Sequence, residues 1–89
     1  MDEIAGRLLI AAGIERRSVN EMTPKQAKSV YLAAGLTITE RSAIEMTTRT
    51  EGERYTVEGL AKMFNEPPYK IEELIIRGYD KLRRAYKSF

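Results

Sequence analysis

The polar side chains near the C-terminal end of the chain have the types and spacing that recognition of nucleic acid requires. Residues 69–77 read YKIEELIIR, in which apolar residues recur three and four positions apart, as on one face of a helix. The opposite face of that helix would carry Tyr69, Lys70, Glu72, Glu73, Ile76 and Arg77. Lysine and arginine pair with guanine edges or phosphates, glutamate accepts from cytosine, and tyrosine contacts phosphate or stacks. The spacing therefore predicts a helix that reads DNA.

Catalytic chemistry has much less support in the sequence. The chain contains no cysteine and no histidine, so it lacks thiolate ligands, the commonest general base and the commonest metal ligand. The neighbouring carboxylates Glu72 and Glu73 diverge around a helix instead of converging on one point, and no glycine-rich phosphate loop is present. We therefore expect no enzyme activity, no metal site and no cofactor.

A helix-turn-helix is the element that would position the outward side chains. Residues 56–84 contain two apolar-periodic segments separated by the break NEPP at 65–68. Asn65 suits a helix end that needs a left-handed backbone, and Pro68 suits a first helical turn. Ala61 is small where the two helices must approach, and the apolar residues expected to lock the pair are Leu60, Phe64, Ile71 and Leu74. This pattern predicts a helix-turn-helix whose second helix faces the major groove.

Capping signals predict three further helices before this pair. The first apolar stripe ends at Gly13, which suits a helix stop. Thr23 and Thr37 each begin a capping box, which Gln26 and Glu40 complete. No segment alternates with a period of two, so we expect no sheet. The sequence predicts an all-α fold of about five helices, the last two forming a helix-turn-helix.

The length of 89 residues predicts a single helical domain. We divide it into two N-terminal helices over residues 1–35 and the helix-turn-helix unit over residues 36–89. The polar residues 15–22 are expected to form a loop or a single turn, and residues 49–55 another connecting loop. A domain of this size buries only about 60% of its unfolded surface, so a homodimer or another partner would add to its stability.

Positive charge is concentrated at the C-terminal end, although the net charge is only +2. From Arg77 onward the only acidic residue is Asp80, and the basic residues are Arg77, Lys81, Arg83, Arg84 and Lys87. An electrostatic footprint for nucleic acid has this form. A solvated helix end whose cations complement the helix dipole has it equally. Charge alone leaves both interpretations open.

The sequence favours a cytoplasmic protein that does not enter a membrane. Its longest apolar run, Leu8 to Ala12, is far too short to span a bilayer. The acidic Asp2 and Glu3 argue against a signal peptide, which would begin with positive charge. We therefore expect a cytoplasmic location.

Several segments between Ile38 and Arg84 carry a resemblance to a known family. They are ITERSAIEM at 38–46, RTEGERYT at 49–56, the spacing of Thr56, Leu60, Ala61 and Phe64, the apolar pair Ile71 and Leu74, and a helix ending in KLR at 81–83. Together they resemble region four of bacterial sigma factors, the C-terminal domain that reads the −35 promoter element. The match has no gap from Thr56 to Arg83.

The resemblance implies roles for particular residues. Arg54 and Thr56 would contact the DNA backbone, and the base-reading positions would be held by Tyr69, Lys70, Glu72 and Glu73. The helices over 38–46 and 57–64 would form a groove for the flap helix of RNA polymerase. The chain departs from the family where Glu66 and two prolines replace the usual Ser or Thr cap, and where Glu72 and Glu73 replace mostly basic or amide residues. Since residues 1–35 also lack a counterpart, we expect a small stand-alone regulator, of the kind that phages and mobile elements carry.

Two functions follow from these observations. The first is a DNA-binding transcription regulator that also contacts RNA polymerase. Its expected contacts with double-stranded DNA are Arg54, Thr56, Tyr69, Lys70, Glu72, Glu73, Arg77, Lys81, Arg83 and Arg84. The second is a protein-interaction module that binds polymerase, a sigma factor or a copy of itself through Ile75, Ile76, Tyr79 and Leu82. The adjacent isoleucines favour the second function, because one helix face does not easily bury both.

Overall fold

The computed structural model describes residues 4–48 and 55–89, and every regular element within these ranges is a helix. The prediction of an all-α fold is therefore confirmed for the described residues. The helices are, in order, α1 (Ile4–Ala11), α2 (Arg16–Asn20), α3 (Pro24–Ala33), α4 (Ile38–Thr47), α5 (Val57–Phe64) and α6 (Pro68–Lys87).

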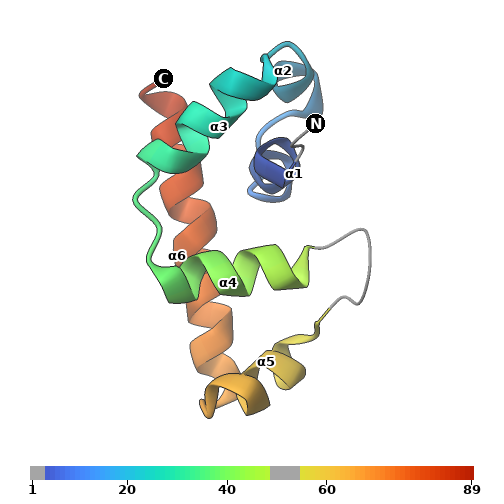
Figure 1. Ribbon diagram of the computed structural model, residues 1–89, viewed down its shortest axis with the longest axis vertical. Helices are drawn as coiled ribbons and strands as arrows, with labels where there is room; N and C mark the ends of the chain where they lie inside the picture. The colour runs from blue at the N-terminus through green and yellow to red at the C-terminus, as the bar shows by residue number, and fades with distance from the viewer. Residues whose placement is uncertain (1–3, 49–54) are drawn as a thin grey trace.

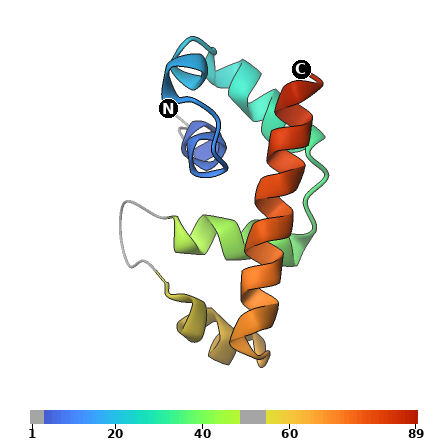
Figure 2. The same ribbon diagram turned by 180° about the vertical axis from the view of Figure 1, so that it is seen from behind.

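The last helix, α6, runs along the length of the molecule (Figure 1). It has 20 residues and is therefore about 30 Å long, close to the 38 Å longest extent of the whole structure. Helices α1 and α3 pack on its C-terminal half, α4 crosses its middle and α5 packs at its start, as the view from behind also shows (Figure 2). The helix α6 therefore contacts the helices at both ends of the protein.

Two apolar clusters form the core along α6. The first joins α1, α3 and the C-terminal half of α6, and its fully buried side chains include Leu8, Leu9, Val30 and Leu82. The second joins α4, α5 and the first half of α6, and it buries Ala43, Leu60, Ala61 and Ile71. The half-buried Ile75 of α6 packs against both clusters, so the two cores are continuous.

Both predicted capping boxes are present. The hydroxyl oxygens of Thr23 and Thr37 each accept from the backbone N–H three residues later, at 3.1 Å. In return, the side chains of Gln26 and Glu40 accept from the threonine N–H groups at 2.8 and 2.9 Å. Gly13, the expected stop of α1, has a φ of 104°, which glycine adopts without strain.

The structure has six helices in its described residues where the sequence predicts five. The additional helix, α2, lies in the polar segment 15–22, which the sequence assigns to a loop or a single turn. Its one buried side chain, Val19, packs against α1, where its Cγ1 faces Gly6. A helix of five residues is not stable by its own propensity and depends on such packing. Because a tertiary contact stabilises this helix, the local sequence does not predict it.

Candidate nucleic-acid interface

The helix α5 ends at Asn65 as the sequence predicts, and a threonine caps its start. The hydroxyl oxygen of Thr56 accepts from the N–H of Gly59 at 3.0 Å and caps the helix. At the other end Asn65 is left-handed, with a φ of 55° and a ψ of 46°, and Pro68 occupies the first turn of α6. Thr56 is exposed, whereas Arg54, the other residue expected to contact the DNA backbone, lies outside the described residues.

The packing of α5 on α6 also matches the expectation. Leu60 and Ile71 are fully buried in one cluster, with Phe64 and Leu74 half-buried around them. Ala61, the small residue expected where the helices approach, is 5% exposed. The three-residue connection over 65–67 and this packing fix the direction in which α6 leaves α5. Its identity as a helix-turn-helix stays a prediction.

The first half of α6 presents to solvent the side chains that the sequence predicts on its outward face. Tyr69 is 58% exposed and Ile76 is 66% exposed. The Nζ of Lys70 lies 5.8 Å from the centroid of the Tyr69 ring, within the range of a cation–π contact. All six residues predicted on the outward face are exposed, namely Tyr69, Lys70, Glu72, Glu73, Ile76 and Arg77.

An open hollow of about 480 Å³ lies beside this face, between the start of α4, the end of α5 and α6. Its lining residues are Thr39, Phe64, Glu66, Lys70, Glu73, Leu74 and Arg77. Its two cations have the same total charge as its two carboxylates, so the lining has no net charge. Phe64 and Leu74 add an apolar part. The hollow is therefore amphipathic, and its charge gives a free phosphate no net attraction.

Lys81, a predicted DNA contact, pairs with a buried carboxylate, although its own side chain is 31% exposed. Its Nζ lies 2.7 Å from Oε1 of Glu40 and 3.4 Å from the carbonyl oxygen of Gly35. The Glu40 side chain is only 2% exposed. Burial raises the pKa of this carboxyl, but the hydrogen bonds from Lys81 and Thr37 and the lysine charge outweigh burial, so the net pKa is lowered.

Two further basic residues of α6 also have partners within the protein. Arg83 donates to the carbonyl oxygen of Ala12 at 2.8 Å and lies 3.7 Å from Asp80. The Nε of Arg84 lies 3.0 Å from the same carboxylate, although the Arg84 side chain is 79% exposed. Sequence reasoning missed these pairings across helices because the partners of Lys81 and Arg83 are 41 and 71 positions away. Their contacts with DNA stay predictions.

The predicted protein-interaction residues do not share one surface. Ile76 is exposed, but Ile75 and Tyr79 are half-buried against the core, and burial raises the pKa of Tyr79. Leu82 is 0% exposed, so its assignment to an interaction surface is wrong in this structure. The reason is that α1 and α3 cover the C-terminal half of α6, which no local pattern reveals.

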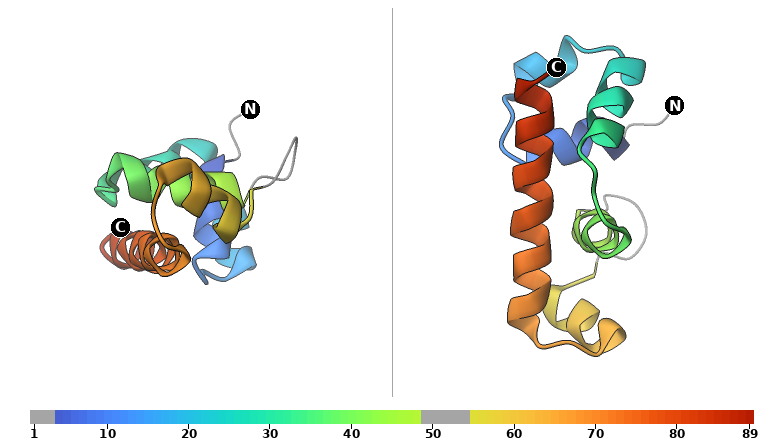
Figure 3. Two further views of the ribbon diagram at one scale, coloured as in Figure 1. Left: turned by 90° about the horizontal axis from the view of Figure 1, so that it is seen from below. Right: turned by 90° about the vertical axis from the view of Figure 1, so that its left-hand side faces the viewer.

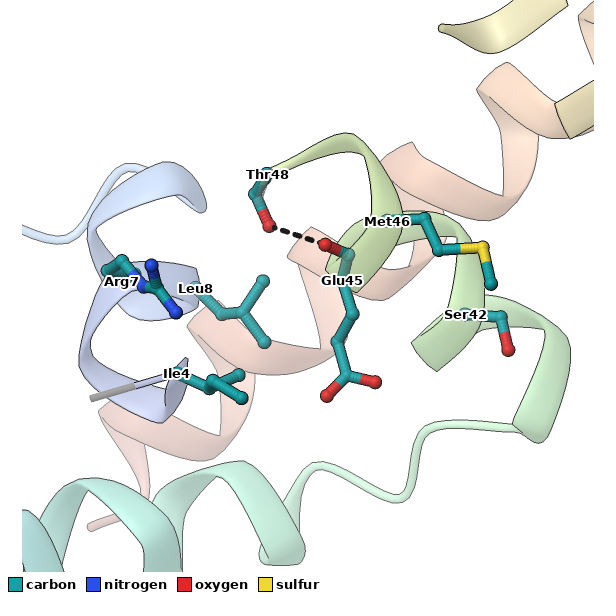
Figure 4. Close-up of a pocket in the computed structure, with 7 residues that line it drawn as sticks. All are labelled: Ile4, Arg7, Leu8, Ser42, Glu45, Met46 and Thr48. Carbon is teal, nitrogen blue, oxygen red and sulfur yellow. Dashed lines mark hydrogen bonds between the residues drawn. The ribbon is translucent and has the colours of Figure 1, made fainter. Parts of the chain in front are cut away.

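A smaller hollow of about 190 Å³ lies between α1 and α4 (Figure 4). It is lined by Ile4, Arg7, Leu8, Ser42, Glu45, Met46 and Thr48, and the hydroxyl of Thr48 donates to the carbonyl oxygen of Glu45. This hollow holds a single carboxylate. The part of the chain that the structure describes contains no group of three or more acidic residues that could hold a metal ion. Nor does any helix in it have the length and apolar character to cross a membrane.

Comparison with known proteins returned no matching family model, no matching curated protein and no matching solved structure. The resemblance to region four of sigma factors therefore depends on the sequence segments quoted above.

Proposed function

We propose that this protein is a DNA-binding transcription regulator whose helix-turn-helix is formed by α5 and α6. The observation that carries the proposal is the pair of helices itself. A left-handed Asn65 ends α5, Ala61 is buried at the crossing, and the outward side of the first half of α6 is exposed. In a helix-turn-helix the second helix enters the major groove and its N-terminal residues contact base edges.

The exposed side chains of α6 have complementary roles in this proposal. Lys70 and Arg77 would pair with guanine edges or with phosphates, and Tyr69 would contact a phosphate or stack. Glu72 and Glu73 would accept from the amino group of cytosine, but they also repel phosphates. The resemblance to region four supports contact with RNA polymerase and a regulator of phage or mobile-element origin.

A salt titration of binding to random-sequence duplex DNA tests the proposal. We expect the affinity to fall steeply with salt, because each released counterion contributes to the slope. The double substitution Lys70→Ala and Arg77→Ala should weaken binding about tenfold at low salt and reduce the slope by roughly two. It leaves Arg83 and its bond to Ala12 intact. The charge-matched control is Arg16→Ala with Arg17→Ala, on exposed positions of α2. Binding that does not respond to salt would contradict the proposal.

A second candidate function is protein interaction, and the exposed apolar residues of α6 favour it. Tyr69 and Ile76 are seven positions apart, so they lie on the same side of the helix, and both are more than half exposed. Ile76→Ser should then abolish binding to purified RNA polymerase, or self-association measured by sedimentation velocity, while reducing DNA affinity far less than Lys70→Ala with Arg77→Ala does. A monomeric parent protein that does not bind polymerase would exclude this candidate.

A further inference from the structure

A second open groove lies at the other end of α6, between α3 and the C-terminal half of the helix. The two helices lie side by side in the right-hand view of Figure 3, and α3 packs on α6. The groove has a volume of about 590 Å³ and is lined by Ser29, Val30, Ala33, Ala34, Lys81, Arg84, Ala85, Ser88 and Phe89. We call it the α3–α6 groove.

The lining of the α3–α6 groove differs in charge from that of the hollow beside α5. None of its nine lining residues is acidic, whereas the hollow beside α5 contains Glu66 and Glu73. It has two cationic side chains, two hydroxyl groups and three alanines. Small side chains allow the backbone of a ligand to approach closely. The cations and the hydroxyl group of Ser88 are hydrogen-bond donors for phosphate oxygens, whereas the hydroxyl of Ser29 already donates to the carbonyl oxygen of Lys25 at 3.0 Å.

Arg84 is the cation in this groove that is best placed to bind a ligand. Its ion pair with Asp80 uses Nε, and its terminal nitrogens make no hydrogen bond to a described residue. Lys25, an exposed residue one helical turn before Ser29 on α3, adds a further positive charge nearby. Lys81 is less available, because Glu40 holds its ammonium group.

The length of α6 determines which part of a duplex this groove would meet. Arg84 follows Lys70 by 14 positions, which corresponds to about 21 Å along a helix. The major groove of DNA is about 12 Å wide. When the start of α6 occupies the major groove, a site about 21 Å away lies beyond its edge, where the sugar–phosphate backbone runs.

We propose that the α3–α6 groove binds the sugar–phosphate backbone of the duplex whose major groove receives the start of α6. This inference rests on the proposed function and names the surface that supplies its phosphate contacts. The exposed side chains at the start of α6 then contribute base contacts, but Glu72 and Glu73 among them lower the affinity because they repel phosphates. The α3–α6 groove contributes attraction that does not depend on the DNA sequence.

Adjacent residues of α3 allow a matched test. Ala33 lines the groove, whereas Leu32 does not, and both are exposed. Ala33→Glu and Leu32→Glu therefore place the same new charge inside and outside the groove. We expect Ala33→Glu to weaken binding to random-sequence duplex DNA more than tenfold at low salt and Leu32→Glu to weaken it less than threefold. Circular dichroism of both variants would establish that the helical fold is retained.

The outcomes separate this inference from the proposed function. Equal affinities of the two glutamate variants, together with weaker binding by the variant with Lys70→Ala and Arg77→Ala, would overturn the groove and keep the helix-turn-helix. If Ala33→Glu weakens DNA binding and the variant with Lys70→Ala and Arg77→Ala does not, the groove is kept and the role of the exposed side chains at the start of α6 is overturned. An effect of Ala33→Glu on a single-stranded oligonucleotide but not on the duplex would overturn the assignment to duplex DNA. A parent protein that binds no duplex would overturn both.

Discussion

Glu40 is the one fully buried charged side chain among the described residues, and it has two structural roles. Its carboxylate completes the capping box of α4 by accepting from the N–H of Thr37 at 2.9 Å. It also accepts from Lys81 of α6 at 2.7 Å. One side chain thus caps one helix and connects it to another, so its protonation should affect the stability of the whole fold.

The pH dependence of stability should report this carboxylate. The pKa of Glu40 in the folded protein lies below its ordinary value of 4.5, so near and below pH 4.5 the unfolded chain binds more protons. The stabilisation is therefore complete above pH 4.5 and is lost as the pH falls through the lower folded value. Glu40→Gln keeps a capping side chain and removes the titration. Denaturant unfolding of this variant between pH 6 and pH 3 should show a shallower loss of stability than the parent, and an identical slope would contradict the role.

The ion pair should also show energetic coupling in a double-mutant cycle. Lys81→Met leaves a buried carboxylate without its cation, and breaking a buried pair in this way costs about 3–5 kcal/mol. Because the Lys81 side chain is 31% exposed, we expect a lower figure of about 2–3 kcal/mol. Adding Glu40→Gln should recover part of this loss. If the changes in unfolding free energy of the two single variants simply add in the double variant, the two side chains do not interact.

At the scale of elements, the turn between α5 and α6 depends on one backbone conformation. Asn65 is the only non-glycine residue with a positive φ in the described chain. Asn65→Ala should destabilise the protein by about 1 kcal/mol, since alanine resists the left-handed region. Asn65→Gly is the matched control and should be neutral or slightly stabilising. Thermal unfolding distinguishes the two variants, and equal midpoints would show that the left-handed turn is not essential.

Local signals predict the helix ends well, whereas contacts between distant residues escape them. The capping boxes that begin at Thr23 and Thr37 follow from side chains three positions apart, so the sequence alone shows them. The helix α2 depends on the burial of Val19 against α1, and the burial of Leu82 depends on how α1 and α3 pack on α6. These two features depend on tertiary packing, which hydrophobic periodicity does not specify.

Over the whole molecule, the charge along α6 becomes more positive toward its C-terminal end. Around its start, Glu66, Glu72 and Glu73 exceed Lys70 and Arg77 by one charge. Beyond Arg77 the helix has four cations and one carboxylate, Asp80, although Lys81 also pairs with Glu40 of α4. Since phosphates dominate affinity for duplex DNA, the proposed function assigns attraction to the C-terminal end of α6 and repulsion to Glu72 and Glu73 near its start.

Removal of that repulsion is a direct test of which face meets DNA. The double substitution Glu72→Gln and Glu73→Gln should tighten binding to random-sequence duplex DNA by about three- to tenfold at low salt, because two carboxylates no longer oppose the phosphates. The gain should shrink as salt screens the charges. Glu15→Gln with Glu21→Gln, exposed positions flanking α2, gives the same change in net charge at the other end. Fluorescence anisotropy would compare both variants with the parent. An equal gain from the two pairs would reflect net charge alone, and the first half of α6 would then not face DNA.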